Sequence, residues 1–172
     1  MVSQEDRLLF FVPFATIKQW DVKRLMKRKT QFKNEVFLKD LLTPIKLTFD
    51  KKDIRAKGYR VVKKINFSGE LFLRDLDESE SVKGNLFSVP SNTLVYSKIN
   101  VKHGCIYYHK IGLPTFGVTS EYPVFMVNQD KVIGEFLILL LQTDYFKEIL
   151  KANDTGISKA RTKVNDFLEI GI

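Results

Sequence analysis

Three side chains that could bind a metal lie close together in the sequence: His103, Cys105 and His109. They share strand parity, so a continuous strand would project all three from one face. Imidazole and thiolate ligands suit zinc, but this spacing matches no common zinc motif and no fourth ligand is evident. The sequence therefore predicts no metal site. We expect Cys105 to pack as a small apolar side chain and the two histidines to lie near strand ends.

Carboxylates are the other candidates for chemistry, and they cluster in the polar segment Asp75–Gly84. Asp75, Asp77, Glu78 and Glu80 could in principle supply an acid and a base. We expect an exposed loop here, in which nothing would desolvate the carboxylates and shift their pKa values. The segment thus favours a solvated acidic loop over a catalytic pair.

The motifs of the common enzyme classes are also missing. Gly112–Gly117 has the glycine spacing of a phosphate-binding loop, but Val118 stands where the lysine of that loop belongs. The sequence has no Gly-x-Gly-x-x-Gly run, which argues against a standard dinucleotide or S-adenosylmethionine loop, and no Gly-x-Ser-x-Gly elbow. We therefore expect a chain with no catalytic residues of its own and no cofactor.

Positive charge is concentrated in the first third of the chain. The formal net charge is +8; residues 18–64 hold 16 Lys/Arg against 5 Asp/Glu, whereas residues 65–150 hold 7 against 10. Such a segment attracts polyanions, because lysines and arginines that neutralise phosphates release condensed counterions. The alternative is a solvated basic face. Binding to a membrane surface is a weaker alternative, since the segment lacks a clear amphipathic stripe.

Length and cysteine content agree with an intracellular globular protein. The 172 residues suit one domain, or one domain with a small extension. Cys105 is the only cysteine, so no internal disulfide can form, which fits a reducing compartment. The apolar runs Leu8–Ala15 and Phe136–Leu141 are far shorter than the ~20 residues of a membrane span. We expect a soluble, cytoplasmic protein that does not bind a membrane.

Local patterns predict strands in the middle of the chain. β-Branched and aromatic residues are enriched there, and Ser68-Gly69 marks a turn between the first two strands. The expected strands are 59–67, 71–76, 93–99, 105–110 and 122–128. The last of them is apolar at both parities, which predicts a strand covered on both faces.

Helices are expected on either side of this strand region. Trp20–Lys29 is typical of a short basic helix or turn, and Glu35–Leu42 of a helix capped by Asn34 and stopped by Pro44. The other expected helices are 130–142, which is apolar enough to be mostly buried, a second one capped by Thr143, and 159–168. Strands followed by helices predict an α+β fold with a mixed, mostly antiparallel curved sheet and a C-terminal helical pair.

The segment Ser88–Gly104 (SVPSNTLVYSKINVKHG) resembles the strand–turn element of target-recognition domains in the specificity subunits of type I restriction–modification enzymes. That family shows an apolar strand, a Ser-Arg/Lys-Ile/x-Asn run and a glycine, matched here by Val95, Ser97–Asn100 and Gly104. Flanking segments resemble the family in the same order from Trp20 onward. They are IKQWDVKRL, VVKKINFSGEL, GVTSEYPVFMVN and FLILLLQTDYFKEILKANDTGISKARTKVNDFLEIGI.

The resemblance implies a function as well as a fold. A specificity subunit carries no catalytic residues; each recognition domain reads one half of a bipartite double-stranded DNA target, and the subunit assembles with a methyltransferase subunit and a restriction subunit. The chain would be a single target-recognition domain over 1–172, with an N-terminal extension at 1–19 and the start of the spacer helix region at 159–172. Family subunits usually carry two such domains. An isolated domain, a fragment or a half-subunit would therefore need a second recognition domain or a homodimer partner.

DNA reading requires contacts to phosphates for affinity and contacts to base edges for specificity. The expected phosphate contacts are Lys63, Lys64, Lys98, Lys102, Lys110, Lys159 and Arg161. The expected base-edge contacts, at strand ends or turns, are Asn66, Arg74, Ser97, Asn100, His103, Thr119 and Ser120. Each has a plainer alternative, which is a solvated surface position for the lysines and turn chemistry for Asn66 and Asn100.

Two alternatives remain open. Tyr96, Tyr107 and Tyr108 could stack bases as on a single-strand-binding sheet, although core packing is the favoured interpretation of these tyrosines. The alternative function is a non-catalytic basic domain that binds RNA or another protein, in which the positive first third is only a solvated face.

Overall fold

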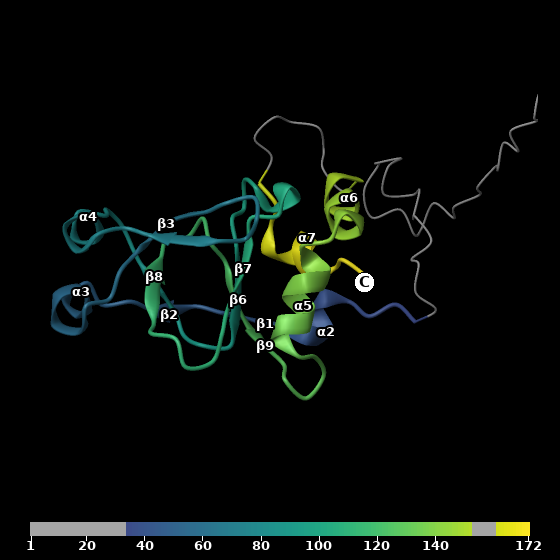
Figure 1. Cartoon of the computed structure of the whole chain (residues 1–172), viewed down its shortest axis with the longest axis horizontal. Helices are drawn as coiled ribbons and strands as arrows, with labels where there is room; N and C mark the ends of the chain where they lie inside the picture. The colour runs from purple at the N-terminus through teal and green to yellow at the C-terminus, as the bar shows by residue number, and fades with distance from the viewer. Residues whose placement is uncertain (1–33, 153–160) are drawn as a thin grey trace, which may run out of the picture.

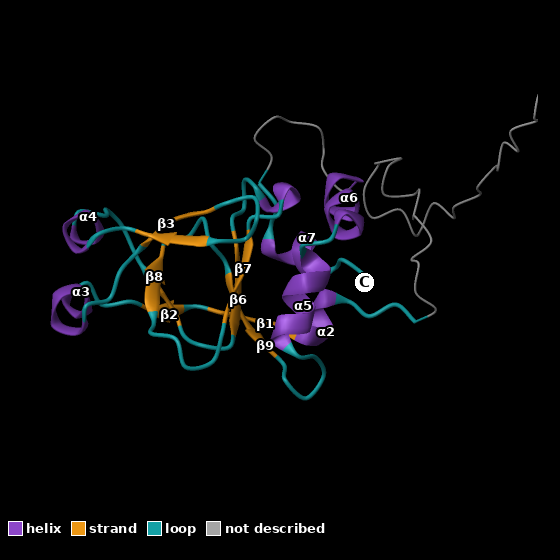
Figure 2. Cartoon of the chain, in the orientation of Figure 1, coloured by secondary structure: helices purple, strands orange, loops and turns teal. Residues whose placement is uncertain are grey.

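Strands occupy the middle of the molecule and helices lie at its two ends (Figures 1 and 2), in a computed structural model that describes residues 34–152 and 161–172. The α+β fold predicted from the sequence is confirmed, with the strands followed by a pair of helices, α5 and α6. In chain order the elements are α2 (Leu38–Leu41), β1 (Leu42–Ile45), β2 (Leu47–Thr48), α3 (Lys52–Lys57), β3 (Val62–Ile65), β4 (Leu71–Leu73), α4 (Leu76–Glu80), β5 (Phe87–Val89), β6 (Thr93–Tyr96), η2 (Val101–His103), β7 (Ile106–His109), β8 (Phe116–Val118), β9 (Val124–Val127), α5 (Gly134–Leu141), α6 (Asp144–Ala152) and α7 (Val164–Leu168).

The largest sheet has four antiparallel strands in the order β1-β9-β6-β7. The interior strand β9 contributes to two separate cores, because Phe125 and Val127 pack toward the helices while Val124 packs on the opposite side. The prediction of a strand covered on both faces is therefore confirmed. Leu137 and Leu141 of α5 and Phe146 of α6 complete the core on the helical side.

The remaining strands form two smaller sheets rather than joining one curved sheet. Strands β2, β5 and β8 make a three-stranded antiparallel sheet, and β3 and β4 make a hairpin. A parallel bridge between Val61 and Gly117 links the hairpin to β8. The second core lies among these sheets, and a third one forms around Phe49, Ile54 and Leu86.

The expected helix over Glu35–Leu42 is reduced to the four residues of α2, and Pro44 lies inside β1 instead of stopping a helix. Proline is tolerated there because β1 is an edge strand, where a missing backbone N–H costs little. The residue at the N-cap position is Phe37, which has no side-chain cap, and not Asn34.

The polar segment Asp75–Gly84 is not simply a loop, since α4 occupies half of it. The expected strand before it ends at Leu73, and Leu76 begins α4. Ser79 is fully buried in this helix, and its hydroxyl oxygen accepts a hydrogen bond from the backbone N–H of Val61 at 3.1 Å. This contact attaches α4 to the strand region.

The first C-terminal helix begins at Gly134 and not at Asp130, because residues 128–131 form a turn. The side-chain oxygen of Asn128 accepts the Asp130 N–H in that turn at 3.1 Å. The second helix begins as expected, since the Thr143 hydroxyl oxygen accepts the Phe146 N–H at 3.3 Å.

One face of α5 contradicts the expectation of a mostly buried helix. Leu137 and Leu141 are fully buried, but Phe136 and Leu139 are 61% and 69% exposed and the preceding Ile133 is 69% exposed. A helix that is apolar all round can bury only the stripe that meets the sheet. None of the helices in the described part of the chain has the length and apolar character needed to span a bilayer.

The last described residues return to the start of the described chain. Helix α7 begins at Val164, several residues later than expected. Residues 170–172 then pair with 36–38 through the hydrogen bonds Val36 N–H to Ile172 O, Leu38 N–H to Ile170 O and Ile172 N–H to Val36 O, each 2.9 Å. The expected extension at 1–19 and the basic segment Trp20–Lys29 lie outside the described residues.

Candidate nucleic-acid interface

Two loops predicted to contact DNA meet at one end of the β3–β4 hairpin. The ring of Phe67 in the hairpin turn lies 5.1 Å from the ring of His103, in the loop that contains η2. The side-chain amide of Gln142 joins this region to the helices, donating to Gly104 O at 3.0 Å and to Ile106 O at 2.8 Å. The structure therefore places the hairpin turn that contains Asn66 next to the loop that contains His103.

The side chain of Asn66 is engaged in the turn itself. Its oxygen accepts the backbone N–H groups of Ser68 at 3.0 Å and Glu70 at 2.8 Å, and its amide donates to the Glu70 carboxylate at 2.6 Å. This is the turn chemistry weighed as the alternative for Asn66. A base edge would have to compete with these three hydrogen bonds.

The cations along the hairpin also have local partners. Lys63 pairs with Glu78 at 3.2 Å, Lys64 lies 4.8 Å from the centre of the Phe72 ring, and the Arg74 side chain donates to Val62 O at 3.3 Å. The hydrogen bond from Lys63 holds the pKa of Glu78 below its ordinary value. These side chains are on the surface, but intramolecular contacts already hold each of them.

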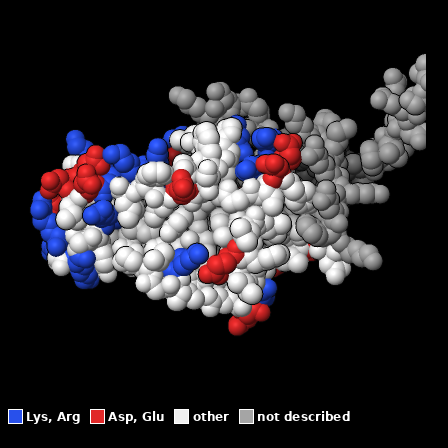
Figure 3. Space-filling model, viewed as in Figure 1, with Lys and Arg blue, Asp and Glu red and all other residues white. Residues whose placement is uncertain are grey.

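Two acidic residues of α4 bind one cation of α3. Arg55 binds Asp77 at 2.8 Å and Glu80 at 2.6 Å, which raises the pKa of its guanidinium. Figure 3 shows blue and red side chains interspersed at the end of the molecule that carries α3 and α4, while much of the visible face is uncharged. These carboxylates are therefore partners of cations and not only solvated groups. The composition of the first third overstates the free positive charge of its described part.

The Ser97–Asn100 run leaves the central sheet and leads into η2. Ser97 is buried, with its backbone N–H donating to Cys105 O at 3.0 Å, and Asn100 occupies the position before η2. His103 is exposed, and Lys102 is half-buried. Of this run and the η2 loop, Lys98 has the most distinctive setting, because it lines a groove.

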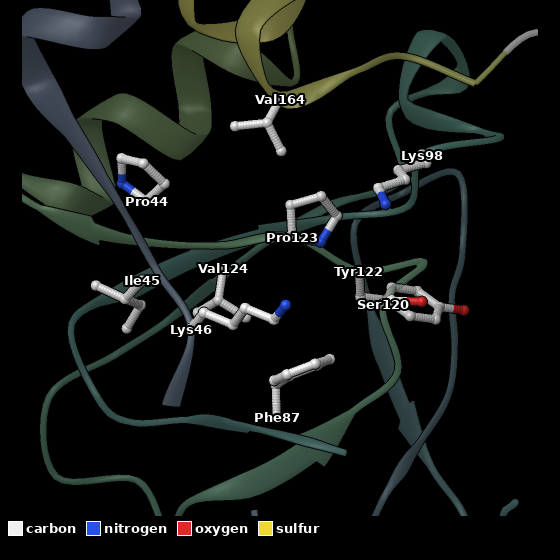
Figure 4. Close-up of a pocket in the computed structure, with 10 residues that line it drawn as sticks. All are labelled: Pro44, Ile45, Lys46, Phe87, Lys98, Ser120, Tyr122, Pro123, Val124 and Val164. Carbon is white, nitrogen blue, oxygen red and sulfur yellow. The ribbon is translucent and has the colours of Figure 1, made fainter. Parts of the chain in front are cut away.

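This groove has a volume of about 320 Å³ and opens where β1, β6 and the start of β9 meet (Figure 4). Lys46 and Lys98 reach into it from the segments that follow β1 and β6, while apolar side chains form most of its walls. Its lining residues are Pro44, Ile45, Lys46, Phe87, Lys98, Ser120, Tyr122, Pro123, Val124 and Val164. Two of the predicted contacts, Lys98 and Ser120, therefore share one cavity.

Arg161, a third predicted contact, lies beside the groove. Lys98 pairs through its backbone with Glu121, whose carbonyl accepts the Lys98 N–H at 3.0 Å, and its own carbonyl accepts the Thr162 N–H at 2.9 Å. The Arg161 side chain binds the Glu121 carboxylate at 2.9 Å. Lys98, Ser120 and Arg161 thus come together from three separate segments of the chain. The backbone carbonyl of Thr119 accepts the Tyr122 N–H at 3.1 Å in the turn that carries Ser120.

Lys46 and Phe87 line the groove as well, although neither was among the predicted contacts. Lys46 lies 5.0 Å from the centre of the Phe87 ring, so the two form a cation–aromatic pair in the groove. Lys110 is placed elsewhere, since it follows β7 at the end of that strand remote from η2. Lys159 lies outside the described residues.

The groups considered for metal binding have separate surroundings. Cys105 is buried in an apolar core, and burial raises the pKa of its thiol to about 11. His109 is also buried, and its Nε2 faces Pro114 O at 3.1 Å, whereas His103 is exposed. Among residues 34–152 and 161–172, no cluster of His, Cys, Asp and Glu could hold a metal ion.

The tyrosines considered for base stacking belong mostly to the core, as favoured from the sequence. Tyr96 is fully buried and stacks on Phe125 with ring centres 5.8 Å apart. Tyr108 is buried as well, and its hydroxyl donates to the Asn92 side-chain oxygen at 3.0 Å. Tyr107 is half-buried, so these residues do not form an exposed stacking platform.

Comparison with known proteins adds a likeness of fold. No protein-family model and no curated protein matches the sequence. The chain is similar to a chain of a solved structure described as "Structural basis underlying complex assembly and conformational transition of the type I R-M system", with a TM-score of 0.61 and 16% sequence identity. The match covers 81% of this chain and 37% of that chain. This chain therefore corresponds to a minor part of that protein, and the likeness is one of fold.

Proposed function

We propose that the chain recognises double-stranded DNA as a non-catalytic target-recognition domain of a type I restriction–modification specificity subunit. It would read one half of a bipartite target in the cytoplasm. The observation that carries the proposal is the fold match, over 81% of the chain, to a structure from a type I system. The Ser97–Asn100 run supports it, since the sequence resemblance centres on that run and Lys98 lies in a groove.

The proposed partners follow from the same resemblance. A methyltransferase subunit would supply the chemistry for modification and a restriction subunit the chemistry for cleavage. A second recognition domain, or a second copy of this chain, would read the other half of the target. The chain would then contribute contacts to phosphates and base edges but no reacting group.

A salt titration of nucleic-acid binding tests the DNA-reading part of the proposal. Duplex DNA should bind weakly to the full chain alone, with an affinity that falls steeply as salt rises, because each neutralised phosphate contributes about −0.9 to the slope of log K against log salt concentration. Single-stranded DNA and RNA of the same sequence serve as controls. A flat salt slope without preference for duplex would instead favour the RNA-binding or protein-interaction alternative.

Assembly is tested by co-expression with a type I methyltransferase subunit. We expect the two chains to co-purify and the complex to methylate a defined bipartite sequence, which sequencing of methylated DNA would identify. Absence of a stable complex with methyltransferase subunits that accept other specificity subunits would contradict the proposed partnership.

A further inference from the structure

We propose that the groove between Lys46 and Lys98 holds one phosphate and the adjoining sugar of the DNA backbone, an inference that rests on the proposed function. The two lysines follow β1 and β6, the strands on either side of β9 in the four-stranded sheet. Strands β1 and β6 both pair antiparallel with β9, so their carboxyl ends meet at the residues that precede β9. Lys46 directly follows β1 and Lys98 lies two residues beyond β6, which places both beside Pro123 (Figure 4).

No carboxylate among the described residues competes with an anion for either ammonium group. Within the described ranges neither lysine has an ion pair, in contrast to Lys63, which binds Glu78, and Lys39, which binds Glu169. Glu121 lies between two residues that line the groove, but its carboxylate is already bound to Arg161. A phosphate that enters between the lysines would therefore gain two charge-assisted contacts without breaking an ion pair, and at Lys46 it would act beside the contact with the Phe87 ring.

The walls of the groove fit a sugar better than a base edge. Pro44, Ile45, Pro123 and Val164 are apolar and offer no side-chain hydrogen bonds, while Ser120 and Tyr122 contribute hydroxyl groups near the groove. Deoxyribose presents apolar C–H surface and few polar atoms, whereas reading a base requires several positioned donors and acceptors. The cavity of about 320 Å³ is also in the size range of a small-molecule site. This surface would fix the register of the duplex and would carry no sequence information.

Attachment of the lysines to the sheet gives the groove a defined shape. The Lys98 backbone bonds Glu121 and Thr162, at 3.0 and 2.9 Å, so the segments before β9 and before α7 are tied to it. Lys46 has its ammonium 5.0 Å from the Phe87 ring centre. A duplex would thus meet a Lys98 whose backbone is fixed by two hydrogen bonds and a Lys46 whose ammonium lies against the Phe87 ring.

The test compares salt slopes of the full chain with Lys46→Gln, Lys98→Gln and both changes, using one duplex. The control is Lys52→Gln with Lys131→Gln, which removes two exposed lysines that do not line the groove. We expect the groove double variant to lower the magnitude of the log–log slope by about 0.9, the value for one phosphate, and the control pair to leave it unchanged. Far-UV circular dichroism confirms that each variant is folded.

Other results overturn the inference in distinguishable ways. A groove double variant that keeps the slope of the unaltered chain removes the groove from the interface but leaves DNA recognition standing, and a loss of about 1.8 means two separate phosphates. Duplex binding that is absent from the unaltered chain at every salt concentration overturns both the groove and the proposed function. Free 2-deoxyribose 5-phosphate, followed by amide chemical shifts of residues in the groove, should bind far more weakly than duplex; tighter binding would assign the groove to a free sugar phosphate.

Discussion

At the scale of single residues, the two histidines of the chain occupy opposite environments. His109 is buried, with its Nε2 near Pro114 O and its ring packed edge-on against Phe116 at 4.9 Å between centres. Its Nδ1 has no hydrogen-bond partner among the described residues. His103 is exposed beside Phe67. Burial lowers the pKa of His109, because a charged imidazolium would lose its hydration there.

This difference predicts how stability depends on pH. A histidine whose pKa is lowered by folding takes up its proton first in the unfolded state, as the pH falls below about 6.5. Stability is then fully present above that pH and declines as the pH falls toward the folded pKa. Urea unfolding at pH 7.5 and 5.5 should show a smaller loss of stability for His109→Gln than for the unaltered chain. His103→Gln, the matched control, should lose as much as the unaltered chain, and equal losses in all three proteins would contradict this role of His109.

At the scale of elements, the hairpin and the η2 loop are joined at a glycine. Gly104 has a φ of +91°, and a Cβ there would lie 2.7 Å from Phe67 O and 2.9 Å from the Gln142 side-chain oxygen. Gly84 has a similar φ of +88°, but a Cβ there would meet nothing within 4 Å. A side chain at Gly84 would therefore add backbone strain alone, whereas a side chain at Gly104 would add strain and a steric overlap.

Alanine at these glycines should have unequal costs. Gly84→Ala should cost about 1–2 kcal/mol, because a residue with a Cβ is strained at positive φ. Gly104→Ala carries the same strain and also an overlap that must push apart the hairpin and η2, which adds roughly 1–3 kcal/mol. Denaturant unfolding measures both. Equal costs would mean that the Phe67–Gly104 contact yields without resistance.

In helix α5, two neighbouring apolar residues differ in burial, so alanine substitutions at Leu137 and Phe136 should have different costs. Leu137 is fully buried, and Leu137→Ala should lower the free energy of unfolding by about 2–5 kcal/mol through lost burial and a cavity. Phe136 is 61% exposed, and Phe136→Ala should change it by no more than about 0.5 kcal/mol. Chemical denaturation of the two variants gives the answer. A large cost for Phe136→Ala would show that something covers this face.

The elements also show how far sequence patterns reach in this chain. The strands around Val95 and Phe125 and the Thr143 cap were predictable, because period-two apolar runs and capping residues act locally. The division into three sheets depends on long-range pairing, such as that of β1 with β9. For the same reason the groove was only half predicted: Lys98 belongs to a recognisable run, while Lys46 reaches it through pairing with a strand about 80 residues away. Exposure of Phe136 was likewise decided by which side of α5 meets the sheet.

At the scale of the whole molecule, charge is organised by pairing as well as by composition. The basic segment and the acidic segment that follows it meet where Arg55 of α3 and Lys63 of β3 are bound to carboxylates of α4. Exposed ion pairs of this kind contribute little to stability, but they remove cations from competition for phosphate. The two lysines of the groove, which have no ion pair within residues 34–152 and 161–172, therefore matter more for an interface than the total of +8 suggests.

The described chain is also closed on itself, because residues 170–172 pair with 36–38 beside α2 and α7. Ile170 is buried in the largest core, and its carbonyl accepts the Leu38 N–H. Ile170→Ala should therefore lower the free energy of unfolding by about 2–5 kcal/mol. The neighbouring Glu169→Ala removes only the exposed pair with Lys39, at 3.1 Å, and should cost less than about 1 kcal/mol. Urea unfolding of both variants tests the closure, and a cost for Ile170→Ala no greater than that for Glu169→Ala would mean that this pairing contributes little to the stability of the fold.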